Sequence, residues 1–171
     1  MAHEPLAIGR VEALAVNGVP ASEAIFFFDG VLGDTHAGRT RRLSGHDGAY
    51  VKTSALAKGT TVFNWRSWTG LSTGEISEVE SLLCCPIPIG CLLENIRISG
   101  IPNFSKLTPT TRLVFPQNKD YRQAILTVWE ENGPCNTVGQ RLEKFHGVNG
   151  LKTNFIRGAQ GKRGVMGFVL S

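Results

Sequence analysis

The sequence predicts a mostly β protein, an antiparallel β-barrel with one or two helices at its rim. Three observations predict this fold class. Short apolar runs recur along the chain, separated by 20 glycines and 8 prolines in 171 residues, which is typical of strands joined by turns. Some of these runs alternate apolar and polar side chains, as strands with one buried face do. Only one segment shows clear helical spacing.

In the first half of the chain, three segments have strand composition. They are residues 8–16, 24–28 and 62–69, and the last of them is rich in aromatic and β-branched side chains. Residues 39–60 are basic and poorly patterned, and we expect this stretch to be mobile. The role of residues 41–58 within it stays open.

The clear helix follows Ser72. Ser72 and Glu75 have the spacing of a capping box, in which each side chain accepts a hydrogen bond from the other residue's backbone N–H. Ile76 and Val79 then begin an apolar stripe at helical spacing. Proline cannot continue a helix, so Pro86 marks the latest point at which this one ends.

The second half adds four strands and a second helix. The predicted strands are residues 92–99, 112–115, 124–130 and 165–170, and the predicted helix is residues 137–145. Glu94 falls on the apolar face of the first of these strands, where a carboxylate needs a partner or a ligand. No internal repeat or linker is evident, so residues 1–171 are predicted to form a single domain.

Composition favours the cytoplasm. No apolar stretch reaches the roughly 18–20 residues of a membrane-spanning helix, and the N-terminus lacks the basic start and apolar core of a secretory signal. Two of the four cysteines, Cys84 and Cys85, are adjacent, and Cys135 is distant from Cys91. Because this spacing makes a poor disulfide framework, we expect a reducing compartment.

Positive charge is unevenly spread. The net charge is +4, yet residues 141–163 contain six Lys and Arg against the single acid Glu143. A second cluster comprises Arg39, Arg41 and Arg42. Two interpretations stay open: solubilising surface charge, or a site for an anionic small molecule or nucleic acid.

Cys135 is the strongest candidate for chemistry. It follows a predicted strand directly, and Pro134 stiffens the backbone from which the thiol emerges. A helix beginning near Thr137 would place its positive N-terminal end beside the sulfur and favour the thiolate. A thiolate suits a nucleophile, a sulfur carrier or a soft-metal ligand, and the alternative is a small buried hydrophobe.

The remaining candidates have weaker signals. Cys84 and Cys85 end an amphipathic helix, which favours core packing. A zinc site made from them with Cys91 and His36 lacks the usual ligand spacing, so none is predicted. His36 with Asp34 fits either an acid–base pair or a polar anchor for the glycine-rich loop.

Several motifs nevertheless occur in an order that resembles the MOSC domain, the module named for the C-terminal part of molybdenum cofactor sulfurase. The resemblance covers nearly the whole chain. Its motifs are Gly-Asp-Thr-His-Ala-Gly at 33–38, the strand-to-helix segment 66–75, Glu-Asn-Ile at 94–96, Leu-Thr-Pro-Thr-Thr-Arg-Leu at 107–113, Pro-Cys at 134–135 and Gly-Lys-Arg-Gly-Val at 161–165.

The resemblance implies a β-barrel with an essential cysteine, here Cys135. That thiol would carry sulfur toward the molybdenum cofactor as a persulfide, or would ligate molybdenum in a reductase of N-hydroxylated compounds. Other residues would bind the cofactor: His36, Arg66, Glu94, Asn95, Asn132, Lys162 and Arg163. Pyridoxal phosphate, common in larger members, is not expected, because this chain lacks the length and the lysine context.

Three functions therefore remain open. They are a sulfur carrier, a molybdenum-dependent N-reductase, and a non-catalytic β-domain that binds an anionic ligand, RNA or a protein through its basic face. The first two imply a cysteine desulfurase or molybdoenzyme partner, or a small-molecule substrate. Nucleic acid is the less favoured partner. Whether the protein is an enzyme is left open.

Overall fold

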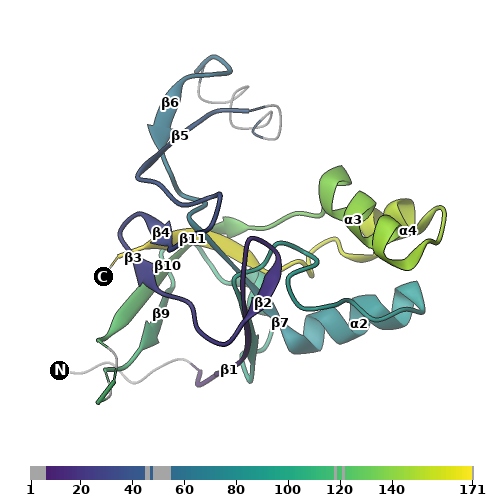
Figure 1. Ribbon diagram of the computed structural model, residues 1–171, viewed down its shortest axis with the longest axis horizontal. Coiled ribbons are helices and arrows are strands. Elements are labelled where there is room, and N and C mark those ends of the chain that lie inside the picture. Colours follow the sequence, from purple (N-terminus) through teal and green to yellow (C-terminus); the bar gives the residue numbers. More distant parts are fainter. Residues whose placement is uncertain (1–6, 45–46, 48–54, 118, 121, 171) are drawn as a thin grey trace.

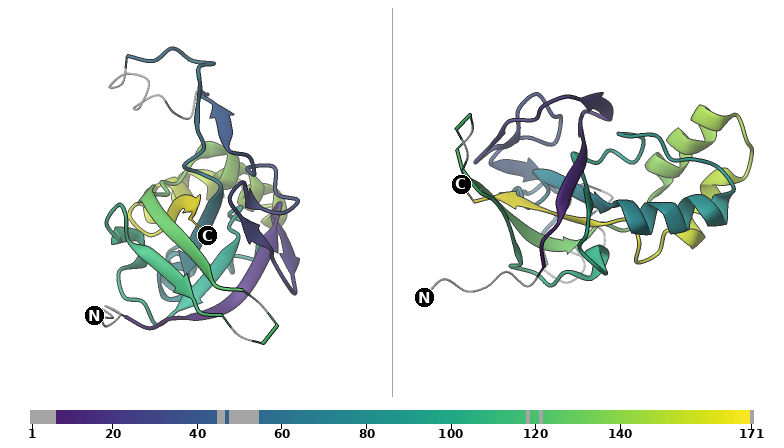
Figure 2. Two further views of the ribbon diagram at one scale, coloured as in Figure 1. Left: turned by 90° about the vertical axis from the view of Figure 1, so that its left-hand side faces the viewer. Right: turned by 90° about the horizontal axis from the view of Figure 1, so that it is seen from below.

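The protein is built around one curled sheet of seven strands, with its helices gathered at one end (Figure 1). The computed structural model describes residues 7–44, 47, 55–117, 119–120 and 122–170. The strand order is β2-β1-β8-β7-β11-β10-β9, and the sheet curls into half of a barrel (Figure 2). The predicted fold class, mostly β with peripheral helices, is confirmed.

Six of the seven strands overlap predicted segments, but β2 was not predicted, and the predicted strand 24–28 gives only the two-residue β3 outside the main sheet. The seven strands are β1 (Arg10–Val16), β2 (Val19–Ala21), β7 (Trp68–Ser72), β8 (Ile96–Ser99), β9 (Arg112–Phe115), β10 (Ala124–Glu131) and β11 (Val165–Val169). Two short ribbons lie outside the main sheet: β3 (Phe26–Phe27) with β4 (Gly30–Val31), and β5 (Thr40–Arg42) with β6 (Thr61–Phe63).

One strand pair departs from the predicted antiparallel arrangement. β7 and β8 run parallel, with Gly70 opposite Ile96, while the other pairs in the main sheet are antiparallel. A parallel pair needs a crossover connection, and α2 (Thr73–Leu83) lies within it, directly after β7. The amphipathic helix recognised in the sequence is thus the element that returns the chain to the same end of the sheet.

The described residues form three helices, one more than the upper number predicted: α2, α3 (Asn136–His146) and α4 (Leu151–Gly158). The capping box expected at α2 is absent, because the Ser72 side chain makes no cap hydrogen bond. Glu75 instead accepts hydrogen bonds from the backbone N–H (3.0 Å) and hydroxyl (2.7 Å) of Ser105, a buried residue in the 3₁₀ turn η2 (Phe104–Lys106). Glu75 therefore accepts from Ser105, which is distant in sequence, in place of the backbone N–H of Ser72 that the capping box would have supplied.

Two of the predicted strands that contribute to the main sheet are markedly shorter than expected. Segment 62–69 is interrupted, since β6 ends at Phe63 and β7 begins at Trp68. Segment 92–99 is extended only from Ile96, because Leu93 adopts a positive φ of 61° and the chain turns there. That turn is what places Glu94 inside the protein rather than along a strand face.

The core has two parts. Trp68, Phe104 and Leu126 are fully buried in the curl of the sheet, and Leu142 and Phe155 are fully buried among the helices. Burial of each large apolar side chain stabilises the fold by roughly 1.5–3 kcal/mol. The two parts meet along β7, whose alternating residues Trp68 and Leu71 face the sheet and helix sides respectively.

The β5–β6 ribbon projects away from the sheet (Figure 1). The stretch predicted to be mobile, residues 39–60, falls partly in this ribbon, and its residues 45–46 and 48–54 lie outside the described residues. Among the residues that the structure describes, no helix is both long and apolar enough to cross a membrane.

Candidate functional site

Cys135 sits at the junction between β10 and α3, where the sequence predicted a strand-end thiol. It is the N-cap residue of α3, with extended backbone angles (φ −135°, ψ 161°), and no side chain caps this helix. The first N–H groups of a helix have no partner within it, and they give this end a partial positive charge. The half-buried free thiol therefore lies at the positive end of an eleven-residue helix.

A pocket of about 460 Å³ opens at this junction. It brings together five of the residues predicted for the site: Cys135, His36, Arg66, Asn132 and Arg163. The rest of its lining consists of Ser44, Thr69, Leu93, Glu130, Glu131, Gly133, Pro134, Thr137, Val138 and Met166. A volume of this size is sufficient for a small molecule.

Arg163 is the buried cation of this pocket, with 6% of its surface exposed. Its Nη1 donates to Asn132 Oδ1 (2.8 Å) and to the Gly133 carbonyl, and its Nη2 donates to the Leu92 carbonyl (3.1 Å). All three acceptors are uncharged. Burial lowers the pKa of Arg163, while the nearby Cys135 sulfur opposes that shift. Arginine nevertheless stays protonated at neutral pH.

Arg66 reaches the pocket from the loop before β7, and its charge is already paired. Its guanidinium lies 3.3 Å from a carboxylate oxygen of Asp47 and 3.3 Å from one of Glu130. Burial raises the pKa of Asp47, but hydrogen bonds from Arg41 and Ser44 and the charge of Arg66 outweigh it, so the pKa of Asp47 lies below its usual range. Arg66 thus links the β5–β6 ribbon to the pocket wall.

Glu94 lies outside the pocket lining, in a buried ion pair. Its side chain accepts from Arg97 Nε at 2.6 Å and from the backbone N–H groups of Gly90 (2.8 Å) and Leu92 (3.1 Å). Arg97 in turn donates to the Ile87 and Pro88 carbonyls. The structure gives Glu94 the paired structural environment that the sequence left as one of two alternatives.

Asn95 and Lys162, the other two predicted residues, also lie outside the lining of the Cys135 pocket. Asn95 accepts a hydrogen bond from the backbone N–H of Thr69 (2.9 Å) and donates to Asp34 (2.9 Å), which ties β7 to the glycine-rich loop. Lys162 Nζ lies 2.6 Å from a carboxylate oxygen of Glu78 on α2. Asn95 is therefore a buried structural residue, and Lys162 forms a surface ion pair.

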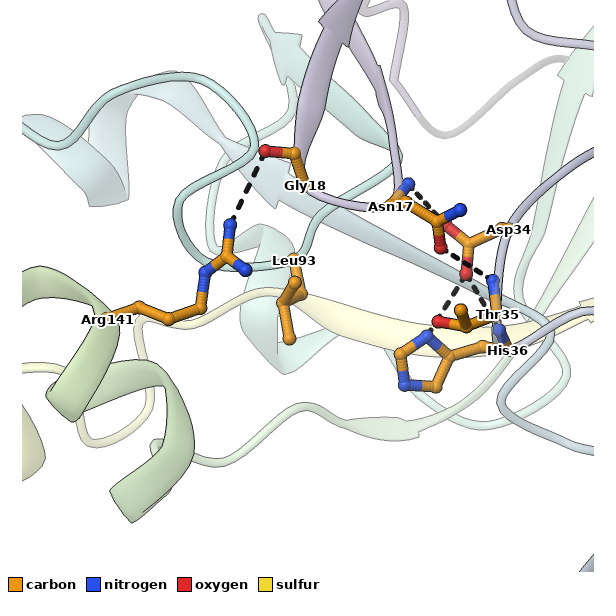
Figure 3. A pocket seen from close by; sticks show the side chains of 7 residues that line it. All are labelled: Asn17, Gly18, Asp34, Thr35, His36, Leu93 and Arg141. Carbon is orange, nitrogen blue, oxygen red and sulfur yellow. Dashed lines mark hydrogen bonds and ion pairs between the residues drawn. The ribbon is translucent and has the colours of Figure 1, made fainter.

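A second, smaller pocket of about 210 Å³ adjoins the first and shares His36 and Leu93 with it (Figure 3). Its polar centre is Asp34, which accepts from the backbone N–H groups of Asn17 (3.0 Å) and His36 (2.8 Å). His36 Nδ1 lies 3.1 Å from the same carboxylate, and Arg141 lies on the far side of Leu93.

The Asp34 carboxylate is ionised over the ordinary pH range. Burial raises the pKa of Asp34, yet the hydrogen bonds from His36, Asn17 and Asn95 together lower it well below its usual range. Because Asp34 fixes the Nδ1 side of the His36 ring, the ring's other nitrogen is the one left to act elsewhere. His36 is more than half exposed, so it can serve either pocket.

The other cysteines occupy different environments. Cys91 is buried and Cys85 half-buried, and burial raises the pKa of both thiols. Cys84 is exposed at the end of α2, where its positive φ of 54° terminates the helix. Within the described part of the chain, no group of three or more His, Cys, Asp or Glu side chains is placed to hold a metal ion.

Two of the basic residues noted in the sequence are also paired. Arg39 lies 3.3 Å from Asp29, and Arg41 forms an ion pair with the buried Asp47 while stacking on the Trp65 ring at 4.4 Å. Sequence reasoning missed Glu130 and Arg141 as pocket residues. The one available signal was the position of Glu130 at the end of the strand that leads to Cys135.

The chain is similar to a known protein both in sequence and in structure. No family model matches the chain. A Bacillus subtilis (strain 168) protein described as "Putative metal-sulfur cluster biosynthesis proteins YuaD" is 29% identical over 143 residues, which span 82% of this chain and 69% of that protein. The crystal structure of the YuaD protein from Bacillus subtilis matches with a TM-score of 0.81 at 24% identity, covering 96% of this chain and 91% of the other.

These findings correct the predicted resemblance to the MOSC domain. The similar protein is described by metal–sulfur cluster biosynthesis and not by the molybdenum cofactor, and no family model supports the earlier identification. The motifs behind it were short and of kinds that turns and strand ends require in many folds. Their order along the chain was therefore a weaker signal than it looked.

Proposed function

We propose that this protein is a sulfur carrier in the assembly of metal–sulfur clusters, holding sulfur as a persulfide on Cys135. The observation that carries the proposal is the placement of a free thiol at the uncapped N-terminus of α3, in an open pocket beside the buried Arg163. Sulfur transfer requires a deprotonated, accessible thiol, and Cys135 is the cysteine that lies at a helix N-terminus in a pocket lined by a buried arginine. The description of the similar Bacillus protein supports the same class of role.

The chemistry needs only one thiolate. The Cys135 thiolate attacks the outer sulfur of a donor persulfide, R–S–SH, and a new S–S bond forms as the donor's S–S bond breaks. The products are Cys135–S–SH and the donor thiolate R–S⁻, so atoms and charge balance. An acceptor thiolate then removes the outer sulfur by the same exchange. A cysteine desulfurase is the expected class of donor and a cluster-assembly protein the expected class of acceptor.

The number of cysteines in the pocket fits the carriage of a sulfur atom better than the binding of a complete cluster. A cluster of iron and sulfur is held by several thiolates, whereas Cys135 is the only cysteine lining its pocket. The cluster is thus the product to which the sulfur goes. Molybdenum ligation by Cys135 and binding of the molybdenum cofactor stay separate predictions, which elemental analysis of native protein would test.

The test is mass spectrometry of the intact protein after incubation with a cysteine desulfurase and cysteine. We expect wild-type protein to gain the mass of one sulfur atom, and peptide mapping to locate it on Cys135. Cys135→Ser removes the thiol while keeping a small polar residue, and we expect this variant to gain no sulfur.

The matched control is Cys84→Ser, because Cys84 is the most exposed cysteine but lines neither pocket. It should load as the wild type does. Persulfide that forms equally on Cys84 and Cys135, or that still forms in Cys135→Ser, would contradict a dedicated carrier role for Cys135.

A further inference from the structure

We infer that the Cys135 pocket also takes sulfur directly from a small molecule, a sulfane sulfur bonded to an oxyanion, of which thiosulfate is the simplest example. This inference rests on the proposed role of Cys135 as a persulfide carrier. It adds a class of substrate that a protein-to-protein carrier does not require. Three features of the pocket support it, namely a buried cation with no ion pair of its own, an uncapped helix end and a nucleophile beside both.

The buried cation is Arg163. Its Nη atoms donate only to neutral oxygens, and among the described residues it has no ion pair. Its buried Nε has no hydrogen-bond partner there either. The negative groups near it are the Cys135 sulfur, which is the nucleophile itself, and Glu94, which is already paired with Arg97. A buried charge without an ion pair of its own is costly, so the site favours a negative group that arrives from outside.

The acids of the pocket do not supply that negative group. Glu130 is engaged with Arg66 (3.3 Å) and with the indole N–H of Trp65 (3.2 Å). Glu131 lies 2.8 Å from Lys106 Nζ. Each carboxylate at the pocket thus has its own partner, and the charge of Arg163 remains available to a ligand.

The helix end supplies further donors. Thr137 and Val138 lie in the first turn of α3 and line the pocket, and no side chain caps the helix. Backbone N–H groups at such a position bind phosphate, sulfate and carboxylate groups. Together with Arg163 they make a site that suits a compact anion with several oxygens.

Cys135 decides what kind of anion is useful there. An anion bound beside a thiolate is a substrate only if it carries an electrophilic atom, and sulfur bonded to sulfur is the atom that thiolates attack. In thiosulfate the outer sulfur is that atom, and the sulfonate group provides the oxygens that the helix end and Arg163 bind. Phosphate and sulfate fit the same donors but have no sulfur to give.

The transfer step is balanced without any further reactant. The Cys135 thiolate attacks the outer sulfur of thiosulfate, S–SO₃²⁻, and the S–S bond of thiosulfate breaks as the Cys135 S–S bond forms. The products are the deprotonated persulfide Cys135–S–S⁻ and sulfite, SO₃²⁻, so the total charge is unchanged. Charge that develops on the leaving sulfite is stabilised by donors already in place, which is how fixed donors accelerate such displacements.

The test is sulfite release and Cys135 persulfide formation when wild-type protein is incubated with thiosulfate and a thiol acceptor. We expect saturable turnover with one sulfur added to Cys135. Excess sulfate should compete with thiosulfate, since it binds the same donors, but should not slow loading by a cysteine desulfurase. Absence of competition by sulfate would overturn the anion site.

Arg163→Met removes the charge, and we expect it to raise the KM for thiosulfate at least about tenfold, the effect of losing one charge-assisted contact. Arg163→Lys should restore part of that loss. The matched control is Arg157→Met, an exposed arginine on α4 that lines neither pocket, and its KM should equal that of the wild type. Equal KM values in all four proteins would contradict the assignment.

The two donors separate this inference from the proposed function. If the desulfurase loads Cys135 and thiosulfate does not, the small-molecule site is wrong and the carrier role stands. If neither donor loads Cys135, both are wrong. Should Arg163→Met fail to fold, the sulfate competition and Arg163→Lys still decide the outcome.

Discussion

The two adjoining pockets differ in how completely their polar groups are paired. In the smaller pocket the Asp34 carboxylate receives hydrogen bonds from two backbone N–H groups, from His36 Nδ1 and from Asn95. In the larger pocket Arg163 forms no ion pair within the part of the chain that the structure describes, and the Cys135 sulfur is one of the negative groups nearest to it. The two pockets share His36 and Leu93, so these differently paired groups lie on either side of the same two residues.

This contrast distinguishes scaffold from site. A buried polar group that is fully hydrogen-bonded rigidifies its surroundings, and Asp34 does so for the glycine-rich loop that carries His36. A buried charge left unpaired marks a place where something else completes the set. The smaller pocket therefore positions one wall of the larger, and the larger is where we expect a ligand to bind.

The largest effect on the scaffold side is expected from Glu94→Gln. The Glu94 carboxylate is the ion-pair partner of the buried Arg97. Glu94 also directly follows Leu93, a residue that lines both pockets. Removing one partner of a buried ion pair typically costs about 3–5 kcal/mol of unfolding free energy. Urea unfolding measures it.

The exposed Glu23 provides the matched control for that substitution. Glu23→Gln should change the unfolding free energy by less than about 0.5 kcal/mol. The folded fraction of Glu94→Gln should still accept sulfur on Cys135, because Glu94 lies outside the pocket lining. A stable Glu94→Gln protein that cannot be loaded would place Glu94 in the site and break the comparison.

Asp34→Asn is expected to have a smaller effect, a loss of about 2 kcal/mol at pH 7, because the amide cannot accept all the hydrogen bonds that the carboxylate accepts. The effect should also depend on pH. Hydrogen bonds lower the pKa of Asp34 in the folded protein below its unfolded value, so its stabilising contribution is complete above about pH 4 and is lost as pH falls.

The difference in unfolding free energy between wild type and Asp34→Asn should therefore narrow from pH 7 toward pH 3. Urea unfolding at several pH values measures it, and the contribution of Asp47, another carboxylate with a lowered pKa, cancels because both proteins contain it. A difference that stays constant with pH would mean that the Asp34 hydrogen bonds contribute nothing to acid sensitivity.

Local sequence patterns predicted much of the fold. The strand before Cys135 and the helix after it were placed within one residue of β10 and α3, because strand alternation and helix spacing are local properties. Helix α4 was missed, since its eight residues are too few to show a periodic stripe and Gly150 precedes it in place of a capping side chain. The parallel β7–β8 pair was missed because pairing direction depends on where the crossover docks.

The candidate site was harder to predict, because its residues come from separate segments. Cys135 could be singled out from its own loop. His36, Arg66 and Arg163 reach it only through the curl of the sheet, and they were selected as a set through a resemblance that the comparisons overturned. Whether a charged side chain is available to bind a ligand also depends on ion pairs between residues distant in sequence, such as that of Asp47 with Arg66.

The smallest effect is expected from Lys162→Gln, which tests the same distinction between adjacent residues. Lys162 pairs with the exposed Glu78 on α2, and a surface ion pair of this kind contributes about 0–1 kcal/mol. Sulfur loading of Cys135, measured by mass spectrometry with either donor, should match the wild type. Arg163, one residue later, is buried at the pocket, and its replacement should alter the response to thiosulfate. If Lys162→Gln raised the KM for thiosulfate as much as Arg163→Met does, thiosulfate use would depend on the total positive charge of this surface. The buried guanidinium of Arg163 would then not be a specific binding group for the anion.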